Sequence, residues 1–257
     1  MHPDIYVSEF KEIYFFGNLR NYNKGVEWYK RYFRGYKGQR YVADVTPFYL
    51  DSEKAPERIK DTLGLDVKFV IMLRNPADRA FSHYLMQSRE RGGVTSFEDI
   101  LKNNARNSRE QSIISNGFFH RNISRYLRIF PEENFHFIFM DDLYADFHRV
   151  ASDLFSFLGV DDIEIEANVF ENQRFMPKRK LLFRLLKKIP NRYKVMLKKA
   201  FGLKTGNDAT RRMAGEAMTG RDEMPDEIRK LLVGIYEEDI RELGNMLGRD
   251  LSKWLEY

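Results

Sequence analysis

Two apolar runs stand out in the pattern of hydrophobic and polar positions along the chain. Val67–Leu73 (VKFVIML) and Asn134–Met140 (NFHFIFM) are nearly continuous in apolar residues, and the first is rich in β-branched side chains. Runs of this length are typical of strands that are buried on both faces of a parallel sheet. A shorter strand is predicted at Arg40–Asp44, after a turn that contains glycine.

Amphipathic segments lie between these runs and predict helices. The predicted helices are Tyr22–Phe33, Lys54–Leu63, a helix that begins at Pro76, Ser96–Asn104, Asn116–Phe130, Phe147–Leu158 and Asp226–Leu247. Gly64, Gly159 and Gly248 directly follow three of them, which is typical of helix C-termini. Because strands alternate with helices, we expect an α/β fold with a parallel sheet flanked by crossover helices.

The composition changes after Asp162. A basic stretch with apolar residues at helical spacing runs from Arg174 to Lys204, and a loop rich in glycine and polar residues follows near Gly206–Asp222. The basic stretch fits a solvated helix pair, a cover over a nucleotide, a surface for a polyanionic acceptor, or contact with anionic lipid. We expect one domain over residues 1–257, with a core at 1–162 and a basic helical part at 163–257.

Composition excludes several classes of function. The chain has no cysteine, which excludes disulfides, thiolate nucleophiles and thiolate zinc sites, and its 5 histidines lack metal-ligand spacing, so no metal is expected. The net charge of +5 favours anionic partners, but 38 acidic residues nearly balance 43 basic ones and no nucleic-acid reader motif is present. No apolar run approaches the roughly 20 residues that span a bilayer, so we expect a cytoplasmic protein without a membrane span, and peripheral membrane contact stays open.

The segment RNPADRAFSHY, which begins at Arg74, lies where a predicted strand ends and a helix begins. Ligands of open α/β sheets bind beyond the carboxyl ends of strands, and a helix N-terminus favours an anion. Arg74 is suited to bind a phosphate bidentately, and Ser82 to donate a hydroxyl. In the structural alternative, Pro76 starts the helix, Asp78 is a first-turn acid and Arg79 forms a surface pair.

A second segment, Phe10–Phe16 (FKEIYFF), places one carboxylate, Glu12, inside an aromatic and aliphatic run. Burial disfavours the ionised form and raises the pKa of a carboxyl group, which suits a proton acceptor near neutral pH. The alternative is a structural ion pair between Glu12 and Lys11 or an arginine at the edge of a strand. Local sequence alone favours this alternative.

Together these segments resemble the PAPS-dependent sulfotransferases, in particular the heparan sulfate sulfotransferases and their bacterial relatives. RNPADRAFSHY matches the family's 3′-phosphate motif R-[DN]-P-x-[DE]-R-x-x-S-x-[YW], and HPDI, FKEIYFF, DVTPFYL and GFFHRNISRYLRIFP follow in family order. The likeness extends from Met1 to at least Val160, and the terminal LGRDLSKWL resembles bacterial members. It implies a P-loop-like sulfotransferase fold. The implied reaction transfers a sulfuryl group from PAPS (3′-phosphoadenylyl sulfate) to a hydroxyl or amine of a glycan, glycolipid or small molecule, with PAP as the product.

The resemblance also implies roles for particular residues. Arg74 and Ser82 take the positions that bind the 3′-phosphate of PAPS, and Glu12 takes that of the catalytic base. Arg174 and Lys178 lie in the segment of the family's C-terminal donor-contacting loop, although the usual K-G-R form is absent. Residue 45 is a valine where the glycan-modifying animal enzymes carry a lysine, which leaves the class of acceptor open.

Members of this family begin with a strand and a K-x-G-T-T loop that binds the 5′-phosphosulfate, followed by a helix that leads into H-P-D. This chain begins at Met1-His2-Pro3-Asp4. We therefore expect the functional protein to extend upstream by that strand, loop and helix. The lysine of the loop stabilises charge on the leaving group, so we expect the chain as written to turn over poorly. The rival hypothesis is an inactive remnant that binds nucleotide or anionic glycan without catalysis.

Overall fold

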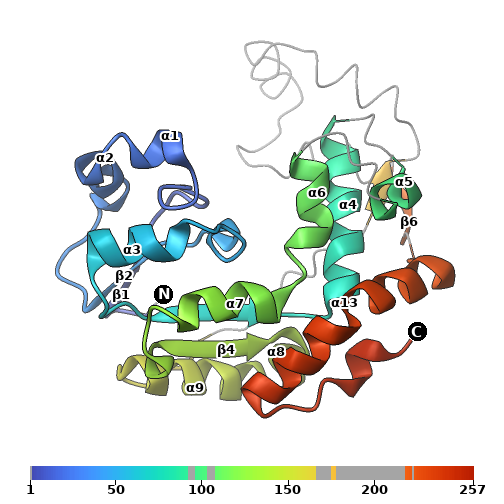
Figure 1. Ribbon diagram of the computed structural model, residues 1–257. Helices are drawn as coiled ribbons and strands as arrows, with labels where there is room; N and C mark the ends of the chain where they lie inside the picture. Colours follow the sequence, from blue (N-terminus) through green and yellow to red (C-terminus); the bar gives the residue numbers. More distant parts are fainter. Residues whose placement is uncertain (1, 92–95, 103–107, 166–174, 178–217, 222) are drawn as a thin grey trace, which may run out of the picture. The chain divides into compact units, whose positions relative to one another are not determined.

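Figure 1 shows the computed structural model, which describes residues 2–91, 96–102, 108–165, 175–177, 218–221 and 223–257. These residues belong to two compact units. The first unit comprises described residues within Met1–Ala77, Ser115–Val169 and Val233–Glu256, and the second comprises those within Asp78–Ile114 and Phe170–Leu232, with Tyr257.

Two pairs of parallel strands lie in the first unit. β1 (Ile5–Val7) pairs with β2 (Tyr41–Ala43), and β3 (Phe69–Leu73) pairs with β4 (Phe135–Phe139). Leu73 lies opposite Phe139, so β3 and β4 end side by side at their carboxyl ends. Parallel strands connected through helices confirm the α/β class, and β2, β3 and β4 fall within the three predicted strands. The three-residue β1 is not predicted by the pattern.

The helices and short 3-10 turns account for most other described residues. The first unit contains α1 (Leu19–Tyr22), α2 (Val26–Lys30), η1 (Arg31–Phe33), η2 (Pro47–Tyr49), α3 (Ala55–Leu63), α7 (Phe119–Leu127), η3 (Glu132–Asn134), α8 (Met140–Ala145), α9 (Phe147–Leu158) and η4 (Ser252–Leu255). The second contains α5 (Phe97–Leu101), most of α6 (Ser108–Ser115), and β5 (Phe175–Pro177) paired antiparallel with β6 (Met218–Arg221). α4 (Pro76–Arg91) and α13 (Asp226–Leu247) each have residues in both units. β6 corrects the prediction of a loop near Gly206–Asp222.

Glycines explain both the helix boundaries that the sequence predicts and those that it misses. α9 and α13 have the predicted bounds, and Gly159 ends α9 in the left-handed conformation, with φ +61°. The helix predicted at Tyr22–Phe33 is instead interrupted at Gly25, which has φ +79° and precedes α2. The helix predicted at Asn116–Phe130 begins only at Phe119, two residues after Gly117.

The face of the β3–β4 pair that α7 covers carries an aromatic cluster. The rings of Phe69 and Phe135 are stacked with centroids 4.8 Å apart. The ring of Tyr126 on α7 lies 5.4 Å from that of Phe69, and Phe130 lies 4.7 Å from it. These contacts fix α7 against β3, the strand that leads to Arg74.

On the face of the β3–β4 pair away from α7, side chains of β4 are covered by α9, whereas side chains of β3 are exposed. On β4, the ring of His136 stacks on Phe157 of α9 with centroids 5.1 Å apart. On β3, the side chains of Val70 and Met72 are 46% and 53% exposed. The prediction that this strand is buried on both faces is therefore wrong, because an apolar run does not reveal which of its faces other elements cover.

The N-terminus of α7 is capped from α13 rather than by its own sequence. Phe118 occupies the N-cap position and makes no side-chain capping bond. Instead, the carboxylate of Asp239 accepts the backbone N–H groups of His120 at 2.9 Å and Arg121 at 3.0 Å. Burial raises the pKa of Asp239. The contact fixes α13 and α7 to each other across 119 residues of sequence.

α13 also packs closely against the residue that precedes Phe118. A Cβ atom at Gly117 would lie 2.6 Å from Cζ of Tyr236, closer than real Cβ contacts come. Tyr236 is fully buried, and its ring packs edge-on against Phe118 at 5.1 Å. Position 117 therefore requires glycine because of space.

We expect Gly117→Ala to lower the free energy of unfolding by about 1–3 kcal/mol, because the methyl group overpacks a rigid site. Urea unfolding monitored by circular dichroism measures the change. The matched control is Gly234→Ala on the exposed face of α13, where nothing lies within 4 Å of an added Cβ. There, alanine should stabilise the helix by about 0.5–1 kcal/mol. Equal effects at the two positions would contradict this account.

Candidate active site

The segment that contains Glu12 is an irregular loop. Glu12 and Tyr14 both have left-handed backbone conformations, with φ +59° and +55°. Ile13 and Phe15 are buried, whereas the side chain of Glu12 is exposed. The prediction that the apolar run buries Glu12 is therefore wrong. The two left-handed residues make the backbone turn, so that apolar side chains enter the core while the carboxylate stays in solvent.

Glu12 is paired with a hydroxyl of its own loop. The Tyr14 hydroxyl donates to Oε2 of Glu12 at 2.8 Å, and the Tyr14 ring packs on Phe48 with centroids 5.4 Å apart. A left-handed conformation at a residue other than glycine costs about 1–3 kcal/mol, and such residues concentrate at functional sites. Here both residues of an acid–hydroxyl pair have it. This pair is the strongest candidate for a reactive centre among the described residues.

The segment after β2 holds the backbone of this loop at two points. The N–H of Glu12 donates to the carbonyl oxygen of Val45 at 2.9 Å, and the N–H of Phe15 donates to the hydroxyl of Tyr49 at 3.0 Å. The side chain of Val45 is 43% exposed. The position at which the sequence departs from the animal enzymes is thus in direct backbone contact with Glu12.

The carboxylate of Asp44 accepts hydrogen bonds from three hydroxyl groups. Its Oδ2 accepts from Tyr49 at 2.7 Å and from Tyr29 at 2.9 Å, and its Oδ1 accepts from Thr46 at 2.7 Å. The Tyr49 hydroxyl therefore donates to Asp44 while it accepts the N–H of Phe15. Asp44 fixes the hydroxyl that holds the Glu12 loop.

Burial and the charge of Asp44 keep the hydroxyl groups of Tyr29 and Tyr49 protonated, so that both can donate hydrogen bonds. Burial raises the pKa of both Tyr29 and Tyr49 well above the usual value, and the negative charge of Asp44 raises both further. The phenols are therefore neutral at every physiological pH. They donate continuously to the carboxylate, which needs donors because it is partly removed from water.

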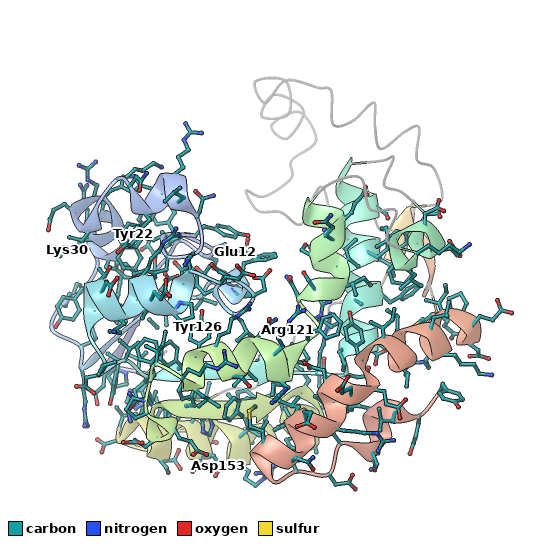
Figure 2. The ribbon with its side chains drawn as sticks, viewed as in Figure 1. Glu12, Tyr22, Lys30, Arg121, Tyr126 and Asp153 are labelled. Carbon is teal, nitrogen blue, oxygen red and sulfur yellow. The ribbon has the colours of Figure 1, made fainter. Side chains whose placement is uncertain are left out.

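α7 connects the Glu12 loop to β3. The hydroxyl of Tyr126 on α7 donates to the carbonyl oxygen of Tyr49 at 2.5 Å, while its ring packs on Phe69 of β3. One residue earlier in the same helix, Arg125 donates to the carbonyl oxygen of Leu50 at 3.3 Å. Figure 2 shows Tyr126 on α7 and Glu12 in its loop. The loop and the strand that leads to Arg74 are therefore packed into one framework.

Arg74 lies in the two-residue connection between β3 and α4. It is half-buried and directly follows Leu73, the last residue of β3. The next residue, Asn75, accepts the N–H of Ala77 at 2.9 Å and so caps the first turn of α4, which begins at the buried Pro76. The strand end and the helix N-terminus meet at Arg74, as the sequence predicts for an anion site.

The rest of the motif belongs to the second unit. Ser82 is half-buried on the second turn of α4. Asp78 forms an ion pair with Arg229 at 3.0 Å, and the guanidinium group of Arg79 donates to the carbonyl oxygen of Ile113. The structural interpretation thus holds for Asp78 as a first-turn acid, whereas this contact of Arg79 is to a backbone carbonyl and is not the surface pair which that interpretation assigns.

Comparison with known proteins gives this arrangement a context. Residues 2–244 match the family model described as the sulfotransferase domain. The chain belongs to the sulfotransferase family.

Similar proteins support the family assignment. The chain is 30% identical over 152 residues to human heparan sulfate glucosamine 3-O-sulfotransferase 5, covering 57% of this chain and 43% of that protein. It is 28% identical over 260 residues to bifunctional heparan sulfate N-deacetylase/N-sulfotransferase 1 of Caenorhabditis elegans, covering 97% of this chain and 27% of that protein. The sulfotransferase chain therefore spans less than half the length of these relatives.

A solved structure supports the fold. A sulfotransferase from Alicyclobacillus acidocaldarius superposes with a TM-score of 0.69 at 24% sequence identity, covering 99% of this chain and 90% of that chain. The expectation of a sulfotransferase fold is thereby confirmed.

Two predicted site residues, Arg174 and Lys178, lie outside the described residues, as does most of the basic stretch. In the described part of the chain, no three His, Cys, Asp or Glu side chains gather as metal ligands. None of the helices described is long and apolar enough to cross a membrane.

No sequence motif indicates a role for Tyr14 or for the tyrosines around Asp44. One local signal exists, because an aspartate two residues before a threonine is a common side-chain pairing at turns. Tyr29 and Tyr49 give no such signal, since they are 15 and 5 residues from Asp44 and only the fold brings their hydroxyls to it.

We expect Asp44→Asn to lower the free energy of unfolding by about 1–3 kcal/mol, because an amide nitrogen cannot accept from a buried hydroxyl. The midpoint of urea unfolding measures the loss. The control is Asp153→Asn at an exposed pair with Arg149, where the N–O distance is 3.0 Å and both side chains are 53% exposed. That change should stay within about 0.5 kcal/mol. A similarly small change at Asp44 would disprove the importance of its three hydrogen bonds.

Proposed function

We propose that this protein transfers a sulfuryl group from PAPS to a hydroxyl or amine of an acceptor. The observation that carries the proposal is the family match over residues 2–244, together with an arginine at the junction of β3 and α4. A strand end beside a helix N-terminus suits a phosphate group, which PAPS carries at its 3′ position.

Arg74 and Ser82 are the proposed ligands of the 3′-phosphate. The guanidinium group offers two parallel N–H donors to phosphate oxygens, and the serine hydroxyl adds a single donor. The two residues are separated by 8 positions along one strand-to-helix segment, the spacing of the family motif that they match. Arg174 and Lys178 are proposed as further donor contacts on the resemblance alone.

Glu12 is the proposed general base. In this mechanism its carboxylate accepts the proton of the acceptor hydroxyl or amine while the acceptor atom bonds to sulfur and PAP departs with the electron pair of the broken S–O bond. The Tyr14 hydroxyl occupies Oε2, which supports a role for Oε1 as the proton acceptor. Transfer of this kind depends mainly on positioning and on stabilisation of charge, which explains why the loop needs firm backbone contacts.

A carbohydrate is the proposed acceptor. The similar human and nematode proteins are named for reactions on heparan sulfate glucosamine and heparan sulfate. Position 45 is an exposed valine, whereas the family resemblance implies a lysine there in the glycan-modifying animal enzymes. This difference argues against recognition of an identical acceptor. A cytoplasmic location stays a prediction from the sequence.

We expect Arg74→Ala to weaken PAP binding by roughly 10- to 150-fold, because a charge-assisted contact worth about 1.5–3 kcal/mol is lost. Isothermal titration calorimetry with PAP measures the affinity. Ser82→Ala should have a smaller effect. The control Arg128→Ala removes an exposed arginine next to α7 and should change the affinity less than about twofold at moderate salt. Equal affinities for the Arg74 and Arg128 variants would overturn the donor site.

In a chain that carries a complete donor loop, we expect Glu12→Gln to reduce sulfate transfer by about 10²- to 10⁴-fold while PAP affinity stays within about twofold, because only the proton acceptor is lost. Transfer of ³⁵S from labelled PAPS to a panel of glycans measures activity. Glu9→Gln, the same change at an exposed glutamate three positions earlier, is the matched control. Activity of the Glu12 variant within a few fold of the control would make Glu12 structural. PAP binding without any transfer in the unchanged protein would favour a binding protein without catalysis.

A further inference from the structure

The C-terminal segment reaches the carboxyl ends of β3 and β4. α13 ends at Leu247, and Gly248 in the left-handed conformation, with φ +60°, allows the chain to turn. The N–H of Arg249 then donates to the carbonyl oxygen of Gly244 at 2.9 Å. A Cβ atom at Gly244 would lie 2.9 Å from the carbonyl oxygen of Arg249, so the turn has little spare room.

Arg249 anchors this segment to the end of β4. Its guanidinium group donates two hydrogen bonds to the carboxylate of Asp142, at 2.6 and 2.7 Å. The same group lies 3.8 Å from the ring centroid of Phe139, the last residue of β4. Hydrogen bonding to Arg249 lowers the pKa of Asp142, so the carboxylate is charged at neutral pH. A bidentate pair on an aromatic ring is a geometrically specific anchor.

Trp254 extends the anchor. It is 4% exposed, and its indole N–H donates to the carboxylate of Asp141 at 3.4 Å. Its ring lies 5.9 Å from that of Phe139. The buried ring fixes the position of the tryptophan backbone beside the strand ends.

The backbone of Trp254 then contacts the phosphate motif itself. Asn75 donates its side-chain N–H to the carbonyl oxygen of Trp254 at 3.3 Å, while its Oδ1 accepts the N–H of Ala77. One side chain therefore caps α4 and attaches the start of that helix to the C-terminal segment. Arg74 is the neighbouring residue, between this attachment and the end of β3.

We propose that Asn75 and Trp254 are positioning residues for the anion site at Arg74, with the C-terminal segment 249–255 acting as a brace. The proposal rests on the proposed function, because it assumes that Arg74 binds the 3′-phosphate of PAP and PAPS. A bidentate contact requires placement within about 0.5 Å, which a two-residue connection does not provide alone. The brace provides it by fixing the helix start with respect to the strand ends.

Two substitutions of Asn75 separate the brace from the cap. Asn75→Ser keeps an oxygen that caps the helix but has no amide to donate to Trp254. Asn75→Ala removes both interactions. We expect the serine variant to bind PAP about three- to tenfold more weakly than the unchanged protein, the effect of one neutral hydrogen bond, and the alanine variant to bind more weakly still.

Changes at Trp254 test the same attachment from the other side. Trp254→Phe keeps a buried ring that places the backbone carbonyl, and PAP affinity should stay within about twofold, whereas Trp254→Ala should weaken binding as much as Asn75→Ser does. In the double variant Asn75→Ser with Trp254→Ala the two effects should not add, because both break one attachment. Lys253→Ala, at an exposed neighbour, and Gly117→Ala, which destabilises the unit elsewhere, are the controls and should leave PAP affinity unchanged.

Amide hydrogen exchange of residues 74–80 without ligand makes the test independent of the proposed function. Faster exchange in the serine variant together with weaker PAP binding is the expected result. Faster exchange with unchanged PAP affinity, or unchanged exchange, would overturn the brace. If the unchanged protein does not bind PAP, the proposed donor site is wrong. In that case, faster exchange in the serine variant would still support the brace and contradict only the assignment of PAP as the ligand. Unchanged exchange would contradict both the brace and the ligand.

Discussion

Backbone N–H groups in loops and at helix starts must find hydrogen-bond partners, and in this protein several of them bond to side chains from elsewhere in the fold or from the same turn. The N–H of Phe15 is satisfied by the Tyr49 hydroxyl, that of Ala77 by Asn75, and those at the start of α7 by Asp239. The first two of these contacts lie in or beside the segments that carry the candidate residues Glu12 and Arg74. They attach those segments to the rest of the unit by hydrogen bonds to side chains.

This arrangement gives an exposed carboxylate the fixed position that the proposed role of Glu12 as a base requires. Glu12 lies in solvent, but its backbone is held at Val45, its loop is held at Tyr49, and its carboxylate is held by Tyr14. Burial of Ile13 between the two left-handed residues, and of Phe15 and Phe16 after them, offsets the cost of their backbone conformations. Exposure leaves the carboxylate accessible from solvent, as the proposed carbohydrate acceptor would require.

Sequence patterns predicted the elements of the fold better than the environment of the site. β3, β4, α9 and α13 were predictable because apolar runs and terminal glycines are local signals. The exposure of Glu12 was not, because a left-handed residue other than glycine leaves no mark in the sequence, and the apolar neighbours indicated burial. The tyrosine partners of Asp44 and the contact of Asn75 with Trp254 were equally out of reach, since only the fold brings them together and Asn75 is separated from Trp254 by 179 residues.

The capping of α7 by Asp239 has a consequence for the order in which the protein folds during synthesis. The helix N-terminus near residue 120 has no cap of its own, and its partner leaves the ribosome 119 residues later. Closing so long a loop is entropically costly, and translation delivers the closing residue long after the start of the helix. The nascent polypeptide therefore holds the start of α7 open, beside an unfilled space for Tyr236, until α13 has emerged. A chaperone that shields apolar surface would have its longest opportunity to act there.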